Sequence, residues 1–223
     1  AIQNCRLPRD PAGRAFGFPR APLEVLVVDE NDKPVPFSTP GELLVRCAGE
    51  NPRQGFFSGY LKQPEETEKV WRHGWLHTGD VVTQREDGML SFVDRKKNII
   101  RRSGENIAAA EVEEALIENS KVKSVAVLAA KDEFHDEEIH ACIVLMPNKE
   151  ASKATAKSIF DFGQNKLITY KLPGWISFVD QIPVTGTQKI RKDAIFPKDF
   201  NLIQDVNSFD MRTFKRKKVV INE

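Results

Sequence analysis

Short apolar runs separated by turn-forming residues occupy the first half of the chain, which is typical of β-strands. Leu23–Val28 and Glu42–Cys47 are apolar runs of strand length. The segment between them carries prolines, which a central strand excludes, together with polar residues that favour turns. We therefore predict a β-hairpin on an antiparallel, partly exposed sheet.

The chain that follows predicts a short helix and a second hairpin. Pro64 suits the first position of a helix, and the acidic residues after it suit the positive helix end. Gly74 is expected to close this helix in a left-handed conformation. Val81–Thr83 is expected to be a strand, and the Asp-Gly pair at 87–88 predicts a tight turn into another strand, Met89–Val93.

The second half of the chain mixes helical and strand spacing. The expected elements are a helix at about Ala110–Asn119, strands Val122–Ala129 and Ile139–Leu145, a helix at about Ala154–Ile168, and a strand Leu172–Val179. An acidic loop over residues 131–138 is expected between the first two strands. Strands covered by helices predict a compact α+β domain of about 100 residues.

Composition narrows the function classes. The 33 basic and 32 acidic side chains nearly balance, so no charge excess points to nucleic acid or a membrane surface. No apolar run approaches the ~20 residues that span a bilayer. Three widely spaced cysteines and four scattered histidines show no disulfide framework and no metal-ligand spacing, which fits a reducing cytoplasm.

The stretch Phe92–Glu114 (FVDRKKNIIRRSGENIAAAEVEE) joins the two halves. An apolar strand breaks into the charged run of residues 94–97, and the chain then turns through Ser103–Asn106 into a helix. A charged break between ordered segments suits a hinge. A strand, a solvated turn and a capped helix explain the same pattern without any function.

This stretch resembles the hinge motif of the adenylate-forming enzymes, which include acyl-CoA synthetases, luciferases and peptide-synthetase adenylation domains. Three further segments match that superfamily in the same order: Gly55–Tyr60, Gly74–Asp80 and Pro183–Lys192. The resemblance covers roughly residues 15–197. It is closest to the CoA ligases of the small-acid or carnitine type.

The resemblance implies an α+β fold in two domains. Residues 1–96 would be the β-rich C-terminal piece of a large adenylation domain. Residues 97–200 would be a small mobile domain that moves about a hinge at Lys97. Residues 201–223 have no counterpart, and we expect a solvated, partly disordered tail there.

The resemblance also assigns the nucleotide site. Thr78 and Asp80 belong to the motif that contacts ribose, and Arg95 would reach ribose oxygens and phosphate with its planar fork. Without the resemblance, Asp80 is an ordinary turn aspartate and Arg95 an exposed charge at a strand end. Lys189 corresponds to the adenylation lysine. Gln188 replaces the usual Gly before it, and Lys192 replaces the usual Arg.

The hinge segment would also contact CoA. The residues of its turn and the two arginines before the turn are the candidates for contacts with the pantetheine and nucleotide ends of CoA: Ser103, Gly104, Glu105, Arg101 and Arg102. Gly104 has no side chain and would let pantetheine pass. The implied activity is an ATP-dependent acyl-CoA ligase that uses a carboxylic acid, ATP and CoA, with Mg²⁺.

The phosphate loop, acyl pocket and acidic Mg²⁺ residue of the superfamily have no match in this sequence. We therefore expect a C-terminal fragment that needs the N-terminal part of the same enzyme and is inactive alone. A peptide-synthetase adenylation domain is an alternative, although no carrier attachment site follows. A non-catalytic nucleotide- or CoA-binding module is another alternative, and Gln188 favours it.

Overall fold

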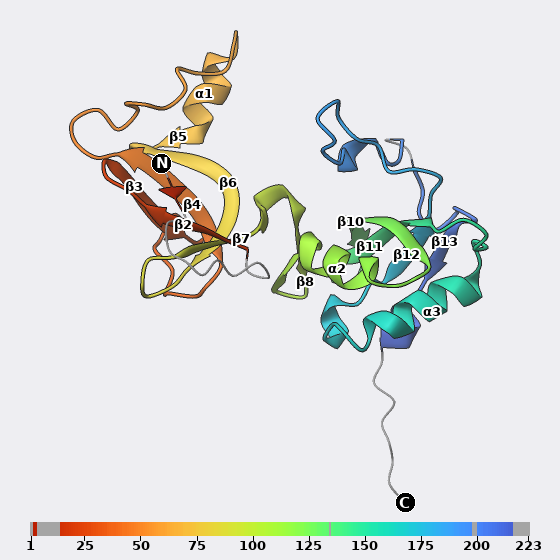
Figure 1. The fold of residues 1–223 in the computed structure, drawn as a ribbon. Helices are drawn as coiled ribbons and strands as arrows, with labels where there is room; N and C mark the ends of the chain where they lie inside the picture. Colours follow the sequence, from red (N-terminus) through yellow and green to blue (C-terminus); the bar gives the residue numbers. More distant parts are fainter. Residues whose placement is uncertain (1, 4–13, 134, 198–199, 216–223) are drawn as a thin grey trace, which may run out of the picture. The chain divides into compact units, whose positions relative to one another are not determined.

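The computed structural model describes residues 2–3, 14–133, 135–197 and 200–215, and the chain divides into two compact units. The first unit is Ala1–Lys97 and the second is Asn98–Glu223 (Figure 1). Within the described ranges, no helix is both long enough and apolar enough to span a bilayer.

The first unit is an antiparallel sheet with one short helix. Its strands lie in the order β1-β2-β7-β6-β4-β3, and β5 pairs with β6. The elements are β1 (Ile2–Gln3), β2 (Ala15–Pro19), β3 (Leu23–Val28), β4 (Gly41–Cys47), α1 (Pro64–Val70), β5 (Trp71–Arg72), β6 (Trp75–Gln84) and β7 (Leu90–Arg95).

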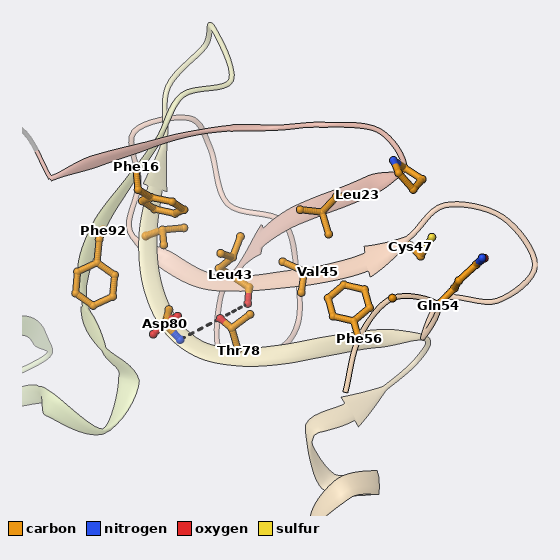
Figure 2. Close-up of a pocket in the computed structure, with 13 residues that line it drawn as sticks. Phe16, Leu23, Leu43, Val45, Cys47, Gln54, Phe56, Thr78, Asp80 and Phe92 are labelled. Atoms are coloured by element: carbon orange, nitrogen blue, oxygen red, sulfur yellow. Dashed lines mark hydrogen bonds between the residues drawn. The ribbon is translucent and has the colours of Figure 1, made fainter. Parts of the chain in front are cut away.

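The first predicted hairpin is confirmed. β3 and β4 pair antiparallel from Leu23 opposite Cys47 to Val28 opposite Glu42. Leu43 and Val45 on β4 pack in a buried cluster with apolar residues of the neighbouring strands (Figure 2). Leu44, on the opposite face of β4, is buried as well, so this strand is covered on both sides.

Pro64 begins α1 as predicted, but Gly74 does not close that helix. The helix ends at Val70 and runs directly into β5. His73 and Gly74 have φ of 50° and 77°, and they form the turn between β5 and β6. The left-handed conformation expected of Gly74 is confirmed, but the residue lies in a hairpin turn and not at the end of a helix.

The second unit combines one sheet with two α-helices. Its sheet has the order β13-β12-β11-β8-β9, and β10 pairs with β11. After the short helix η1 (Lys96–Asn98), the elements are β8 (Ile99–Arg102), β9 (Glu105–Ala108), α2 (Ala109–Ile117), β10 (Val122–Asp132), β11 (Asp136–Leu145), α3 (Lys153–Gly163), η2 (Thr169–Lys171), β12 (Trp175–Phe178), η3 (Lys192–Ala194), β13 (Ser208–Asp210) and η4 (Arg212–Lys215).

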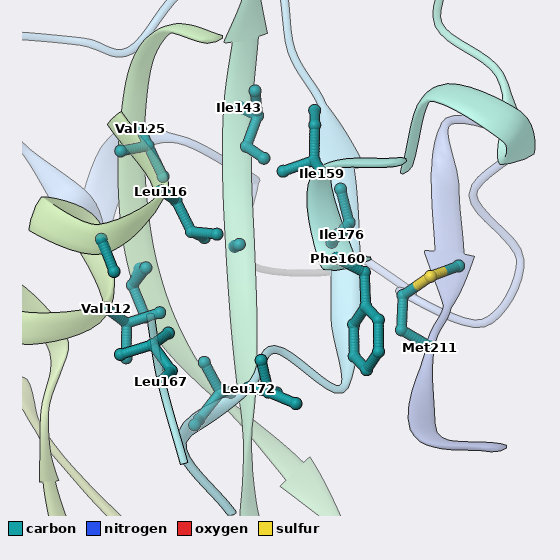
Figure 3. Packing of buried hydrophobic residues seen from close by; sticks show 14 of the residues in the cluster. Val112, Leu116, Val125, Ile143, Ile159, Phe160, Leu167, Leu172, Ile176 and Met211 are labelled. Carbon is teal, nitrogen blue, oxygen red and sulfur yellow. The ribbon is translucent and has the colours of Figure 1, made fainter. Parts of the chain in front are cut away.

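The core of the second unit lies between the sheet and the helices (Figure 3). Val112 and Leu116 come from α2, and Ile159 and Phe160 come from α3; all four are fully buried. They meet apolar residues of β10, β11 and β12. Both predicted helices are thus present, but the helix expected over about Ala154–Ile168 ends at Gly163.

Two further expectations for this unit were wrong. The predicted acidic loop is largely strand, because β10 extends to Asp132 and β11 starts at Asp136. The expected solvated tail is ordered over 208–215, where β13 pairs with β12 and Met211 is fully buried. The rest of the basic tail, residues 216–223, lies outside the described residues.

The other face of this sheet carries a buried histidine. His140 on β11 bonds through Nε2 to Ser177 Oγ at 2.6 Å, and the ring of Phe196 stacks on it. Burial lowers the pKa of His140 to about 4, and Asp205 opposes this only in part. The folded chain therefore keeps His140 neutral at mildly acidic pH.

We expect the second unit to lose stability as the pH falls from 6.5 towards 4. The unfolded chain takes up a proton on His140 below its usual pKa of 6.5, whereas the folded chain does not. The difference amounts to about 3 kcal/mol at pH 4. Urea denaturation read from hydrogen exchange in β11 measures it. His140→Gln should flatten this dependence, and an unchanged slope would contradict the assignment.

Candidate functional site

The motif at Thr78–Asp80 lies inside β6 and not in a turn before a strand. Gly79 has φ 70°, which any other residue would adopt only with strain. Thr78 Oγ1 donates to the Leu43 carbonyl at 2.7 Å and accepts the Asp80 N–H at 3.1 Å (Figure 2). These two bonds fix the orientation of the Asp80 backbone.

The three nucleotide-site candidates of the sequence lie together. Asp80 on β6 is directly opposite Arg95 on β7. Arg95 Nε lies 2.8 Å from Asp80 Oδ1, and its Nη1 donates to the Thr78 carbonyl at 3.2 Å. Burial raises the pKa of Asp80, while the Arg95 charge acts to lower it. A partly buried carboxylate thus faces a half-exposed guanidinium.

An apolar depression adjoins this pair (Figure 2). Its volume is about 850 Å³. Its lining residues are Phe16, Pro22, Leu23, Leu43, Val45, Cys47, Gln54, Gly55, Phe56, Thr78, Asp80, Val82 and Phe92. A few polar groups at the margin of an apolar hollow are typical of small-molecule sites.

Glu42 belongs to the same site and was missed in the sequence. Its side chain is 6% exposed, and it lies 2.7 Å from Lys96 Nζ and 3.4 Å from His77 Nδ1. It also accepts the Gly79 N–H at 3.2 Å. Burial favours a raised pKa for Glu42, but Lys96 and His77 hold it below its usual value. Glu42 therefore holds the backbone beside Asp80.

Lys97 is the last residue of the first unit. It is exposed and lies in η1, between β7 and β8. Its neighbour Lys96 is bound to Glu42 in the first unit. The boundary between the units thus falls at the position that the sequence assigns to the hinge.

The candidates for CoA binding form a β-hairpin. Ser103 and Gly104, with φ of 50° and 82°, make the turn between β8 and β9. Ser103 Oγ lies 3.0 Å from His135 Nδ1, and the Arg101 N–H bonds to Glu137 at 2.7 Å. A Cβ added at Gly104 would meet no atom within 4 Å. The turn therefore presents unobstructed backbone.

Arg102 differs from its neighbours in this hairpin. Its side chain is 13% exposed, and its Nε lies 3.0 Å from both carboxylate oxygens of Glu138. Lys215 Nζ lies 2.5 Å from the same carboxylate. The guanidinium of Arg102 is thus engaged inside the second unit.

Lys189 lies exposed at the end of a tight loop. Val184 and Ile190 form a β-bridge, and the Thr185 N–H bonds to the Lys189 carbonyl at 2.8 Å. Gln188, which stands where the superfamily usually has Gly, has φ 62°, in the left-handed region that favours glycine. A non-glycine residue there costs about 1–2 kcal/mol. The loop thus keeps the glycine-type backbone without the glycine.

The proteins that this chain resembles belong to one family. Residues 111–189 match the model of the AMP-binding enzyme C-terminal domain. The crotonobetaine/carnitine–CoA ligase of Salmonella heidelberg is 35% identical over 76% of this chain and 32% of its own length. The long-chain-fatty-acid–CoA ligase of Escherichia coli O6:H1 is 32% identical over 79% of this chain and 30% of its own length.

Solved structures agree with these relatives. The o-succinylbenzoate CoA synthetase of Bacillus subtilis, in complex with its acyl-adenylate intermediate, has a TM-score of 0.70 and 26% identity. That match covers 84% of this chain and 36% of the other. The amide bond synthetase of Marinactinospora thermotolerans has a TM-score of 0.65 and 32% identity, with 81% and 35% covered.

The chain spans about a third of the length of the curated relatives that it matches. The match over 170 residues is longer than either unit, so it includes residues of both the β-rich first unit and the α+β second unit. Residues 111–189 thus belong to the C-terminal domain family of the AMP-binding enzymes, and about four fifths of the chain is related to the adenylate-forming enzymes.

Proposed function

We propose that this chain forms the C-terminal part of an AMP-forming acyl-CoA ligase that acts in the cytoplasm. The observation that carries the proposal is the cross-strand pair of Asp80 and Arg95 beside an apolar depression. Relatives named as CoA ligases support it. The acyl group, and any role in fatty-acid metabolism, depends on residues outside this chain.

In this proposal Thr78, Asp80 and Arg95 hold the nucleotide. The Asp80 carboxylate would accept bonds from the ribose hydroxyls. Its Oδ1 is buried and lies 2.8 Å from Arg95 Nε, so both oxygens would take a hydroxyl only once Arg95 has turned away. Arg95 already lies against Asp80 and would turn its remaining donors to ribose or phosphate oxygens. The adjoining apolar wall suits the flat face of a base.

The first half-reaction is the attack of a carboxylate oxygen on the α-phosphorus of ATP. A P–O bond to the acid forms and the bond to pyrophosphate breaks, which leaves an acyl-adenylate. Negative charge grows on the non-bridging oxygens, so catalysis consists mainly of positioning and electrostatic stabilisation. Lys189 would supply its ammonium to these oxygens and to the attacking carboxylate.

The second half-reaction is the attack of the CoA thiol on the acyl carbonyl, with AMP as the leaving group. We propose that the second unit turns about Lys97 between the two steps. Ser103, Gly104 and Glu105 would then line the path of pantetheine, and the bare backbone at Gly104 supports this role. Arg101 and Arg102 are the candidates for the CoA nucleotide, and the Arg102 guanidinium is bound to Glu138.

Among the described residues, no group of three or more His, Cys, Asp or Glu side chains could hold a metal ion. Mg²⁺ that arrives with ATP is commonly bound by one or two carboxylates together with substrate phosphates and water. In this proposal its protein ligands lie mostly outside this chain, and we derive no step through the metal.

The test of the nucleotide site uses the complete protein that carries this chain. Wild type should bind ATP about 10²–10⁴-fold more tightly than 2′,3′-dideoxy-ATP, because two bonds to a charged group contribute about 1.5–3 kcal/mol each. Asp80→Ala should bind both nucleotides with the weaker affinity. Isothermal titration measures all four affinities, with Asp87→Ala on the turn after β6 as a surface control.

Equal affinity of the wild type for both nucleotides would contradict the ribose role of Asp80. The product that forms in the presence of CoA distinguishes the three candidate functions. Thioester formation identifies a ligase, whereas acyl-adenylate without thioester favours a peptide-synthetase adenylation domain. Nucleotide binding with neither product favours a non-catalytic binding module.

A further inference from the structure

We propose that Lys192 is a positioning residue for Lys189, and that Glu113 and the edge of β10 hold it in place. This inference rests on the proposed adenylation role of Lys189. It assigns a separate task to the second lysine of the same loop, through contacts that lie entirely within the second unit.

Lys192 is part of a closed triangle of polar contacts. Its Nζ lies 2.7 Å from Glu113 Oε1 and donates to the Val127 carbonyl at 3.0 Å. The Val127 N–H in turn donates to Glu113 Oε1 at 2.8 Å. The two side chains therefore satisfy both backbone groups of one residue and also neutralise each other.

The triangle occupies the free edge of a strand. β10 pairs with β11 on one side and with no other strand among the described residues. An unpaired edge leaves backbone N–H and C=O groups that need partners. Glu113 from α2 and Lys192 from η3 supply these partners, so the loop is joined to both the helix and the sheet.

The neighbouring cation provides a contrast. The Arg191 side chain is 52% exposed and pairs with Asp193, which is 75% exposed and two residues away. Lys192 and Glu113 are 19% and 20% exposed. Exposed pairs contribute little, because water and salt screen them. The contacts of Lys192 are sheltered and reach a distant part of the chain, as a loop anchor requires.

The position of this anchor matters for Lys189. The loop leaves the sheet after β12, where the Val179 N–H bonds to the Ile143 carbonyl at 2.9 Å. It returns at Lys192, three residues after Lys189. The intervening hairpin is exposed at its tip, so its direction depends on the two fixed ends. Loss of the Lys192 contacts would leave Lys189 on a longer and looser segment.

The experiment compares Lys192→Met with Arg191→Met in the complete protein. Lys192→Met keeps most of the apolar stem and removes the charge. We expect acyl-adenylate formation to fall by about 10- to 100-fold in kcat, because small misplacements of a reacting group have effects of this size. The KM for ATP and the transfer of a supplied acyl-adenylate to CoA should stay within about twofold of wild type. Arg191→Met should match wild type in both steps.

Three further variants distinguish positioning from misfolding: Glu113→Gln, the double variant Glu113→Gln/Lys192→Met, and Lys192→Arg. Glu113→Gln should reproduce the loss of Lys192→Met, and the double variant should lose no more, because both changes break one unit. Lys192→Arg should recover most of the rate, since its guanidinium can reach both oxygen acceptors. Loss of both half-reactions together in Glu113→Gln and Lys192→Met would overturn the positioning role.

The outcomes also separate this inference from the proposed function. If Lys189→Ala abolishes adenylation while Lys192→Met behaves like Arg191→Met, the anchor is wrong and the proposed function stands. If Lys189→Ala adenylates normally, the proposed function itself fails. If only Lys192→Met is inactive and Glu113→Gln is normal, Lys192 acts on the substrate directly and the anchor is again wrong.

Discussion

Lys189→Ala, in the complete protein that carries this chain, is expected to slow acyl-adenylate formation by about 10²–10³-fold. The step develops negative charge around the α-phosphorus, and the substitution removes a preorganised cation there. Transfer of a supplied acyl-adenylate to CoA should continue near the wild-type rate, because that step begins from an activated carbonyl. Exchange of pyrophosphate into ATP that depends on added carboxylic-acid substrate measures the first step, and thioester formation measures the second.

Arg191→Ala is the matched control, since it removes an exposed cation two residues away in the same loop. Equal losses in both half-reactions for Lys189→Ala would indicate misfolding or a shared binding role. A normal first step in Lys189→Ala, together with a large loss in Lys192→Ala, would mean that the adenylation lysine lies three residues later than proposed.

Glu138→Gln is expected to lower the free energy of unfolding of the second unit by about 3–5 kcal/mol. Glu138 is fully buried and is shared by Arg102 and Lys215, which are 13% and 7% exposed. Burial lowers the pKa of Lys215 to about 8, and the Glu138 charge works against that shift. A neutral amide would leave two sheltered cations without their counter-charge.

Chemical denaturation at neutral pH, read from hydrogen exchange in β11 and β12, measures this loss. Glu118→Gln is the control, because its pair with Lys166 is 56% and 41% exposed and should contribute less than about 1 kcal/mol. Similar losses in both variants would contradict the stabilising role of the buried cluster. The position of the Glu138 side chain also requires a glycine at 174, because a Cβ added there would come within 2.3 Å of the Glu138 Cδ atom.

The regular elements followed from the sequence where burial and spacing agree. The hairpin of β3 and β4 was predicted within one residue, because its apolar positions are bounded by turn-forming residues. The ends of β10 and β11 were not, since charged residues there suggested a loop. A paired strand end tolerates such side chains when their charges face solvent or each other.

The part of the candidate site that lies within sequence motifs was predictable. Thr78, Asp80 and Arg95 could be named from motifs, and strand pairing brings them together. Glu42 could not be named, because a carboxylate within an apolar strand has no pattern of its own. Its importance depends on Lys96 and His77, which reach it only in the folded sheet. Long-range polar contacts of this kind leave no periodic trace in a sequence.

The ordered segment at 208–215 changes how the second unit should be delimited in the laboratory. The family match ends at residue 189, so an expression boundary drawn from it would discard β13 and the residues after it. Such a product would lack the strand that covers the edge of β12 and the Met211 side chain that fills the core. It would also separate Glu138 from one of its two cations. A purification tag, by the same reasoning, belongs after a spacer beyond residue 215 rather than directly on η4.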